Sequence, residues 1–156
     1  MRKRIFTATP ETVRSRAEAW LDVERAAIVE LTSEDKDYPI ESAFVSVDAR
    51  GWRAAAPGSQ TIRLVFDQPQ RLKHISLVFE ENETARTQEF VLRWSSGDSS
   101  FREIVRQQWN FSPPETSREV EEYQVELSNV TVLELIIVPN MSGGAARASL
   151  KSLRLS

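Results

Sequence analysis

The sequence has no cysteine and only one histidine, His74. Without cysteine there is no disulfide bond, no thiolate ligand for zinc or an iron–sulfur cluster, and no cysteine nucleophile. A single histidine excludes metal sites that need two, and any catalytic triad would depend on that one residue. The five glycines form neither of the phosphate-cradling loops GxxxxGKS/T and GxGxxG. We therefore expect a protein that is not an enzyme.

Neither a strong charge nor a long hydrophobic run is present. Twenty basic and 23 acidic side chains give a net charge of −3, whereas dedicated nucleic-acid-binding domains usually carry a basic surplus on one face. No segment approaches the run of about 18 apolar residues that reads as a membrane span. The basic start Met1–Phe6 is followed by Thr7–Glu11 instead of the apolar stretch of a signal peptide. We expect a cytoplasmic protein with no nucleic-acid partner and no membrane partner.

The chain does contain enough apolar residues for one folded domain. Its 156 residues, 40% of them hydrophobic, predict a single domain over residues 1–156. Near the start, Thr9 and Pro10 suit the cap and the first position of a helix. Apolar residues then follow at helical spacing: Val13, Ala17, Trp20 and Leu21. This predicts a helix over residues 10–21 that packs on the domain through Trp20.

After about residue 25 the apolar period becomes two, the spacing of β-strands. Turn-forming residues separate the alternating segments, which are 27–31, 62–66, 75–79, 90–94, 123–127, 133–138 and 150–155. In the last segment Leu150, Leu153 and Leu155 do not share one parity, which predicts an irregularity near Lys151-Ser152. The connections are too short for the crossover helices of a parallel sheet. The pattern predicts an all-β fold, an antiparallel β-sandwich of about eight strands with one short N-terminal α-helix.

Three segments resemble the motifs of discoidin domains, the factor V/VIII C-type modules of the galactose-binding-like superfamily. Residues 43–52 read AFVSVDARGW, which is similar to the opening alanine, aspartate and tryptophan of that family. Residues 90–101 resemble its Y-x-V-x-x-S-x-D-G-x-x-W motif, and residues 148–155 resemble its closing A-x-L-x-E-I-x-L. The similarity extends over residues 25–155. It implies a jelly-roll sandwich that acts as a binding module, with carbohydrate as the ligand class.

The sequence departs from the discoidin pattern at two positions that bear on calcium. Ser152 stands in the place of the closing glutamate, which is often a calcium ligand in that family, and Ala49 replaces the glycine after Asp48. Calcium takes about six to eight oxygen ligands, several of them anionic. We therefore expect no cofactor and no calcium site of the family type.

Trp52 is the first candidate for binding, because it lies between predicted strands and next to Gly51 and Arg53. A pyranose stacks its apolar face on an aromatic ring while polar groups fix the surrounding hydroxyls. Trp52 is therefore either such a platform or a core residue, which is the usual place of the equivalent tryptophan in the family that the sequence resembles.

The loop at residues 80–88 supplies the second group of candidates. Arg86 matches an arginine that contacts ligand in sugar-binding relatives, and its planar set of donors suits a hydroxyl or a carboxylate. The alternative is that Arg86 pairs with Glu83 or Glu89 in a solvated loop. Loops at one end of a rigid sandwich commonly carry recognition residues. The candidate site at that end consists of Tyr38, Trp52, Arg53, Asn82 and Arg86.

Of two groups of acidic residues, one is predicted to be solvated and the other to protect a strand edge. Residues 80–83 include three glutamates, but a glycosidase needs two carboxylates that face each other across a cleft, one of them with a raised pKa. Neighbouring residues on one loop do not supply that arrangement. Glu119, Glu121 and Glu122 precede a predicted strand and are expected to discourage pairing at its edge.

Two functions from different classes stay open at this point. The first is a non-catalytic binding module for carbohydrate, which the discoidin resemblance implies. The second is an intracellular protein–protein interaction module on the same scaffold, since a fold does not determine a function. An exposed aromatic residue presented by the loop around Arg86 would favour the first.

Overall fold

A computed structural model describes residues 20–46, 48–98 and 100–156 of the protein. Over these ranges the protein is mostly β-structure, with two short helices. The helices are α2 (Val23–Ala26) and α3 (Ser42–Val45). The strands are β1 (Ala27–Leu31), β2 (Trp52–Arg53), β3 (Gln60–Glu80), β4 (Arg86–Ser95), β5 (Arg102–Phe111), β6 (Arg118–Val138), β7 (Ser149–Leu150) and β8 (Ser152–Leu155). Over these ranges, neither helix has the length and apolar character that a bilayer crossing requires.

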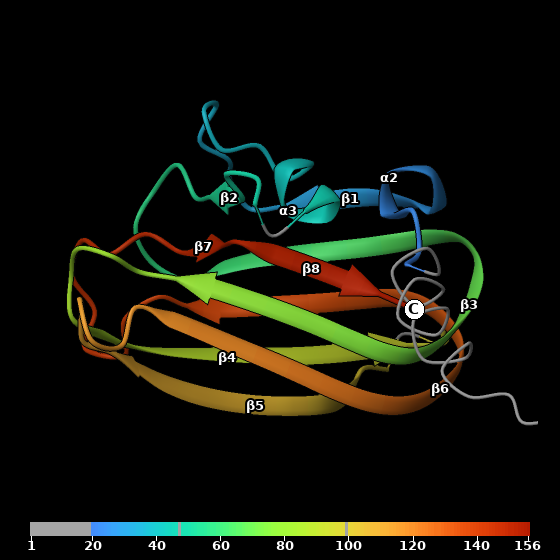
Figure 1. The fold of residues 1–156 in the computed structure, drawn as a ribbon. Coiled ribbons are helices and arrows are strands. Elements are labelled where there is room, and N and C mark those ends of the chain that lie inside the picture. Colours follow the sequence, from blue (N-terminus) through green and yellow to red (C-terminus); the bar gives the residue numbers. More distant parts are fainter. Residues whose placement is uncertain (1–19, 47, 99) are drawn as a thin grey trace, which may run out of the picture.

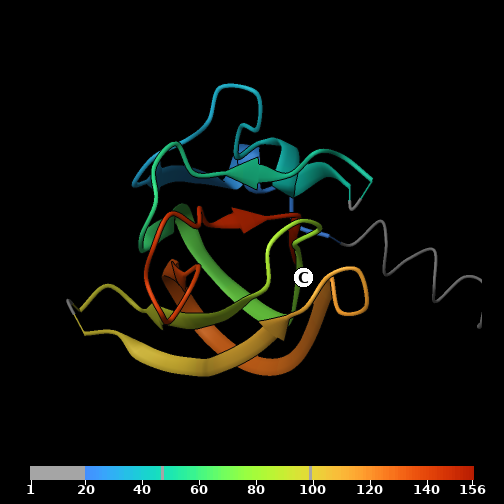
Figure 2. The same cartoon turned by 90° about the vertical axis from the view of Figure 1, so that its left-hand side faces the viewer.

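The paired strands are antiparallel and form two layers (Figures 1 and 2). Residues 62–66 of β3 lie between β1 and the second half of β6, and that half of β6 also pairs with β4, which pairs with β5. Residues 75–78 of β3 lie between β8 and the first half of β6. One layer therefore has the order β1-β3-β6-β4-β5 and the other the order β8-β3-β6, with the β2–β7 pair beside them. This confirms the predicted antiparallel sandwich.

The strands β3 and β6 each run through both layers and bend at the right-hand end of Figure 1. Their pairing register shifts at the bend, and Asn129 of β6 has a φ of 58°. Pro69 of β3 lies at this bend, where its missing N–H is tolerated because the ladder is interrupted. Asparagine accepts a positive φ more readily than most residues do. The segment Asp67-Gln68-Pro69 was expected to separate two strands. That expectation is wrong, because the segment lies within one continuous strand that supplies both layers.

Apolar side chains with a period of two fill the space between the layers, as the sequence predicts. The buried ones on the long strands include Ile62, Leu64, Phe66, Leu72, Ile75, Leu77, Phe79, Phe90, Leu92, Leu133, Leu135 and Ile137. The rings of Phe79 on β3 and Phe90 on β4 pack with centroids 5.1 Å apart. Aromatic pairs at such a distance contribute about 0.5–1.5 kcal/mol beyond the burial of their area. This core fixes the two layers and leaves the loops at the ends of the sandwich available for binding.

The predicted helix over residues 10–21 lies outside the described residues, except for Trp20 and Leu21. These two residues contact the C-terminal strand. The backbone N–H of Leu21 donates a hydrogen bond to the carbonyl of Leu155 at 2.7 Å. The Trp20 ring packs against the His74 ring with centroids 5.3 Å apart, and the Arg154 guanidinium lies 5.3 Å from the Trp20 centroid. The chain that leads into α2 is thus attached to the sandwich.

A pair of acidic residues on β6 faces the interior. Glu119 is buried and Glu121 is half-buried on the same side of the strand. The Nε2 of Gln88 donates to the Oε1 of Glu119 at 3.3 Å, whereas the Oε2 atoms of Glu119 and Glu121 are both buried without a hydrogen-bond donor. Burial, together with the neighbouring carboxyl group of Glu121, raises the pKa of Glu119 to about 8. Glu119 was expected to discourage edge pairing, but it faces the interior instead, because it shares the inward parity of Tyr123.

This buried acid predicts a specific dependence of stability on pH. The folded protein holds the proton of Glu119 to a higher pH than an ordinary glutamate with a pKa of 4.5. The free energy of unfolding should therefore fall as the pH rises from about 5 to about 8. Glu119→Gln removes this titration and should reduce the fall by more than about 1.4 kcal/mol, the equivalent of one pKa unit.

Urea unfolding below and above this pH range measures the effect. Glu126→Gln is the matched control, because Glu126 is an exposed acid on the outer side of the same strand. An unchanged pH dependence in Glu119→Gln would contradict the raised pKa of the buried Glu119.

Candidate ligand-binding site

A pocket of about 660 Å³ opens between the loops at one end of the sandwich. This end lies on the left in Figure 1 and faces the viewer in Figure 2. The pocket is lined by Tyr38, by Arg50, Trp52 and Arg53 at β2, by residues 80–84 at the end of β3 and after it, and by residues from 140–151 around β7. Its size lies within the range of about 300–1,000 Å³ that is common for small-ligand sites.

The short β2–β7 pair brings distant parts of the chain together at this pocket. Arg53 pairs with Ser149 across the two strands, and the N–H of Ala54 donates to the carbonyl of Ala148 at 2.9 Å. The N–H of Arg53 also donates to the carbonyl of Tyr38 at 3.2 Å, which holds Tyr38 beside β2. Backbone hydrogen bonds, rather than side-chain contacts alone, therefore fix the positions of these lining residues.

Gly51 is needed for this arrangement. A Cβ atom at Gly51 would lie 2.6 Å from the carbonyl oxygen of Leu150 and 2.8 Å from the Cα of Lys151, and the φ of Gly51 is +79°. Only glycine fits such an approach at a positive φ without strain. Lys151 stands at the break between β7 and β8, where the sequence predicted an irregularity, and its N–H donates to the carbonyl of Val78 at 2.8 Å.

Among the five candidate residues, Tyr38 is the aromatic residue whose ring is accessible from the pocket. Its ring is half-buried, and the guanidinium carbons of Arg50 and Arg53 lie 5.4 and 4.8 Å from its centroid. Trp52 also borders the pocket, but only 1% of it is exposed, and its Nε1 donates to the carbonyl of Ser33 at 3.1 Å. Trp52 was expected to be either a stacking platform or a core residue. The structure shows that it is a core residue, so its ring is not available for stacking.

Arg86 does not line the pocket. Its side chain is 1% exposed, and its guanidinium lies 4.8 Å from the centroid of the Phe111 ring. Its Nε donates to Oε1 of Glu81 at 2.7 Å, and its NH1 donates to the carbonyl of Pro139 at 2.6 Å and to Oε1 of Gln88 at 3.2 Å. This corrects the expectation of an exposed, ligand-contacting Arg86, because its donors are already bound within the protein.

The ion pair with Arg86 changes the charge that Glu81 presents to the pocket. Burial would raise the pKa of Glu81, but the hydrogen bonds from Arg86 and from the N–H groups of Glu83 and Thr84 outweigh burial and hold this pKa below its usual range. Glu81 therefore stays ionised, with its charge compensated by Arg86. On the same side of the pocket, Glu80 lies 3.9 Å from Arg118 and accepts a hydrogen bond from Asn82 at 3.2 Å.

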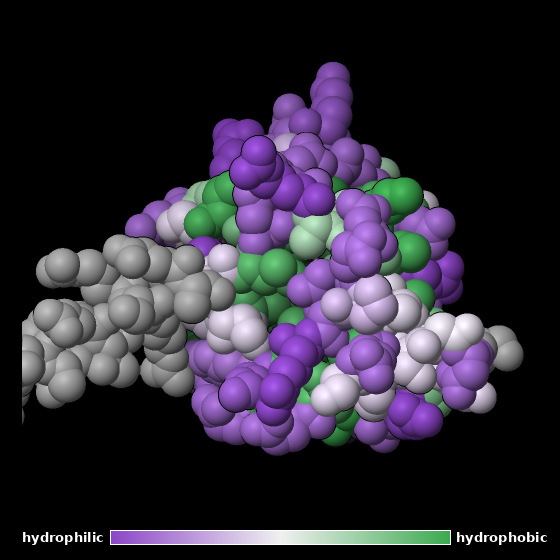
Figure 3. Space-filling view, turned by 90° about the vertical axis from the view of Figure 1, so that its right-hand side faces the viewer, coloured by the Kyte–Doolittle hydropathy of each residue, from purple (hydrophilic) through white to green (hydrophobic). Residues whose placement is uncertain are grey.

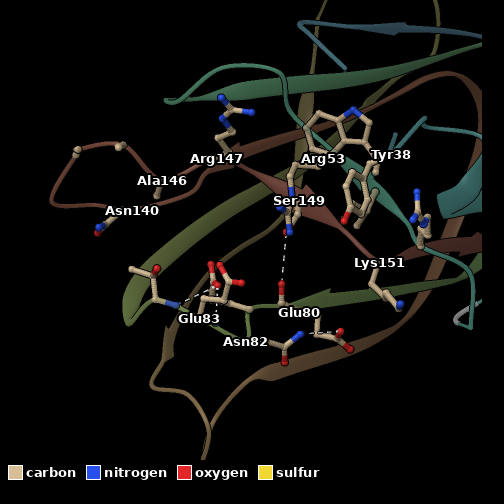
Figure 4. A pocket seen from close by; sticks show the side chains of 18 residues that line it. Tyr38, Arg53, Glu80, Asn82, Glu83, Asn140, Ala146, Arg147, Ser149 and Lys151 are labelled. Carbon is tan, nitrogen blue, oxygen red and sulfur yellow. Dashed lines mark hydrogen bonds between the residues drawn. The ribbon is translucent and has the colours of Figure 1, made fainter. Parts of the chain in front are cut away.

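The positively charged residues of the pocket are arranged differently. Arg50, Arg53, Arg147 and Lys151 line the pocket, and among the described residues none of the four forms an ion pair. Figure 4 shows Arg53 and Arg147 beside the strand that carries Ser149, with Asn82 and Glu83 on the opposite side of the opening. The pocket thus has a basic wall and an acidic wall.

The structure brings together four of the five predicted site residues. Tyr38, Trp52, Arg53 and Asn82 line the pocket, and Arg86 lies outside it. Sequence reasoning missed Arg147 and Lys151. The irregularity predicted at Lys151 was the one signal that pointed to that residue. Over the described ranges, no group of three or more histidine, aspartate and glutamate side chains is gathered as a metal site, and Ser152 is buried in β8.

The buried Arg86 leads to a prediction about stability. Arg86→Ala leaves Glu81, Gln88 and the carbonyl of Pro139 without their shared donor, so it should destabilise the protein by about 3–5 kcal/mol, as breaking a buried ion pair does. Arg118→Ala is the matched control, because that arginine is 48% exposed in its side chain and should cost at most about 1 kcal/mol. Denaturant unfolding measures both values. Equal, small losses in the two variants would contradict the structural role of Arg86.

Comparison with solved structures finds the same fold in family 32 carbohydrate-binding modules. The module of NanJ from Clostridium perfringens, in complex with galactose, is 13% identical, with a TM-score of 0.60 over 87% of this chain and 96% of that chain. The module CpGH89CBM32-5 from Clostridium perfringens, in complex with GalNAc-β-1,3-galactose, is 16% identical, with a TM-score of 0.62 over 88% and 99%. The module of AlyQ, in complex with 4,5-unsaturated mannuronic acid, is 15% identical, with a TM-score of 0.60 over 88% and 97%.

These similarities concern the fold, since the sequence identities are low. No protein-family model and no curated protein sequence matches the chain. Some of the similar modules are parts of larger enzymes, such as a module from a family 31 glycoside hydrolase of Clostridium perfringens. The chain has the discoidin-like jelly-roll fold of family 32 carbohydrate-binding modules, as its motifs predicted.

Proposed function

We propose that the protein is a non-catalytic module that binds carbohydrate in the pocket at the loop end of the sandwich. The observation that carries this proposal is the pocket itself, which combines the accessible ring of Tyr38 with the amide of Asn82 and several charged donors. The fold it shares with sugar-binding modules adds support.

The lining of the pocket suits a polyhydroxylated ligand. A sugar offers apolar C–H faces and hydroxyl groups that both donate and accept hydrogen bonds. Asn82 supplies an amide, and Ser149 supplies a hydroxyl whose Oγ donates to the carbonyl of Glu80 at 3.5 Å. Glu83 is exposed and accepts hydrogen bonds through its carboxylate. These groups line the same pocket as the Tyr38 ring, against which a pyranose would lie.

The acids at the pocket do not form a hydrolytic pair. Glu80, Glu81 and Glu83 come from one strand end and the loop that follows it. A general acid in such chemistry needs a raised pKa, whereas the ion pair with Arg86 and backbone N–H groups hold the pKa of Glu81 below its usual range against the effect of burial. The proposed function is therefore binding without catalysis.

The rival proposal, a protein–protein interaction module, has less support. Interaction surfaces commonly show as contiguous exposed apolar patches. The exposed large hydrophobic residues of the described chain are spread over β1, α3, β6 and the loop after β6: Ile28, Val45, Val120 and Met141. At the end of the sandwich opposite the pocket, hydrophilic side chains are in the majority (Figure 3).

Binding to a broad glycan array tests the proposal, followed by titration calorimetry with the best glycan. Tyr38→Ala and Asn82→Ala should each weaken binding by about tenfold or more, which corresponds to about 1.4 kcal/mol from lost stacking or hydrogen bonds. Gln124→Ala is the control, because Gln124 is an exposed amide on the outer side of β6, away from the pocket, and should bind like the wild type. A protein that binds no glycan, or variants that bind as tightly as the control, would contradict the proposal.

A further inference from the structure

We propose that the pocket selects an acidic carbohydrate, one whose sugar ring carries a carboxylate, and that Arg53, Arg147 and Lys151 bind this group. The inference rests on the proposed function and names the ligand class of the same site. Its basis is the imbalance of charge between the two walls of the pocket, which the overall composition of the chain does not suggest.

The charge of the pocket is opposite to that of the whole protein. The chain carries a net charge of −3, yet four positively charged side chains line the pocket. Two of its three acids are compensated from outside the pocket, Glu81 by Arg86 at 2.7 Å and Glu80 by Arg118 at 3.9 Å. Glu83 is the one lining acid without an ion pair among the described residues. An anion is therefore attracted to the basic wall.

Three of the four cations also have free donors. Within the described part of the chain, the side chains of Arg53, Arg147 and Lys151 donate no hydrogen bond, whereas the NH1 of Arg50 donates to the carbonyl of Asp37 at 3.1 Å. The guanidinium carbon of Arg53 lies 4.8 Å from the centroid of the Tyr38 ring, a cation–π contact that uses none of its N–H donors. Hydrogen bonds between such cations and a carboxylate are about twice as strong as neutral ones.

The opposite wall gives the ligand an orientation. Figure 4 shows Glu83 and Asn82 across the opening from Arg53 and Arg147. The carboxylate of Glu83 repels an anionic group but accepts hydrogen bonds from sugar hydroxyls. A sugar acid would therefore turn its carboxylate toward the basic wall and its hydroxyls toward Glu83 and Asn82. A neutral sugar makes only the second set of contacts.

Titration calorimetry with matched pairs of glycans tests this selectivity. The probes are oligogalacturonate, oligomannuronate and sialyllactose, each compared with its carboxyl-reduced form, which keeps the ring and loses the charge. At least one acidic probe should bind about tenfold or more tightly than its reduced partner, and the difference should shrink at high salt as the charges are screened. The three acidic probes separate a uronate ligand from a sialate ligand.

Variants locate the effect in the basic wall. Arg147→Gln and Lys151→Gln should each weaken binding of the acidic probe about tenfold and weaken binding of the reduced probe much less. Glu83→Gln should strengthen binding of the acidic probe. Arg71→Gln is the control, because Arg71 is an exposed arginine, 66% accessible, at the bend of β3.

Three results would overturn the inference in distinguishable ways. If the protein binds neutral glycans as tightly as acidic ones, carbohydrate binding stands and the selectivity for a carboxylate is wrong. If a sulfated glycan binds better than every carboxylated probe, the basic wall recognises another anion. If none of the glycans binds, the proposed function itself fails.

Discussion

The arrangement of the binding end depends on one buried guanidinium. A charge with 1% side-chain exposure is tolerated only when its donors are satisfied, because desolvating an unpaired ion costs several kcal/mol. Arg86 finds its acceptors in Glu81, Gln88 and the carbonyl of Pro139. Glu81 belongs to the loop after β3, and Pro139 begins the loop after β6. Satisfying one arginine therefore fixes two of the loops that border the pocket.

The same ion pair decides the charge of the pocket. A carboxylate bound to Arg86 no longer compensates the cations that Gly51 and the β2–β7 pair place on the other side. On the outer face of the sandwich the buried charge is an acid instead of an arginine. Glu134 is 1% exposed and is bound by both Arg63 and Arg93. In both places a buried charge is surrounded by partners. Arg53, Arg147 and Lys151 differ from these residues because they have no such partner among the described residues, and this makes them suited to an external ligand.

The sequence predicted the fold well because a half-buried sheet leaves a period of two, which the core residues between Ile62 and Ile137 follow. It predicted Tyr38, Arg53 and Asn82 as neighbours because loops at one end of a sandwich converge. Arg86 was placed wrongly although a signal existed: Arg86 shares its parity with Phe90 and so faces the core. Arg147 was missed because its position depends on the β2–β7 pair, which joins segments far apart in the chain. No local pattern encodes such a pairing.

The central claim is that a carboxylate on a sugar meets the basic wall that the Arg86 ion pair leaves uncompensated. A crystal structure of the protein with the tightest-binding acidic oligosaccharide tests it directly. The account predicts the carboxylate at about 2.7–2.9 Å from the donors of Arg53, Arg147 or Lys151, with the sugar ring against Tyr38 and Arg86 still bound to Glu81. A sugar bound outside this pocket, or one whose carboxylate points to solvent or toward Glu83, would contradict the account.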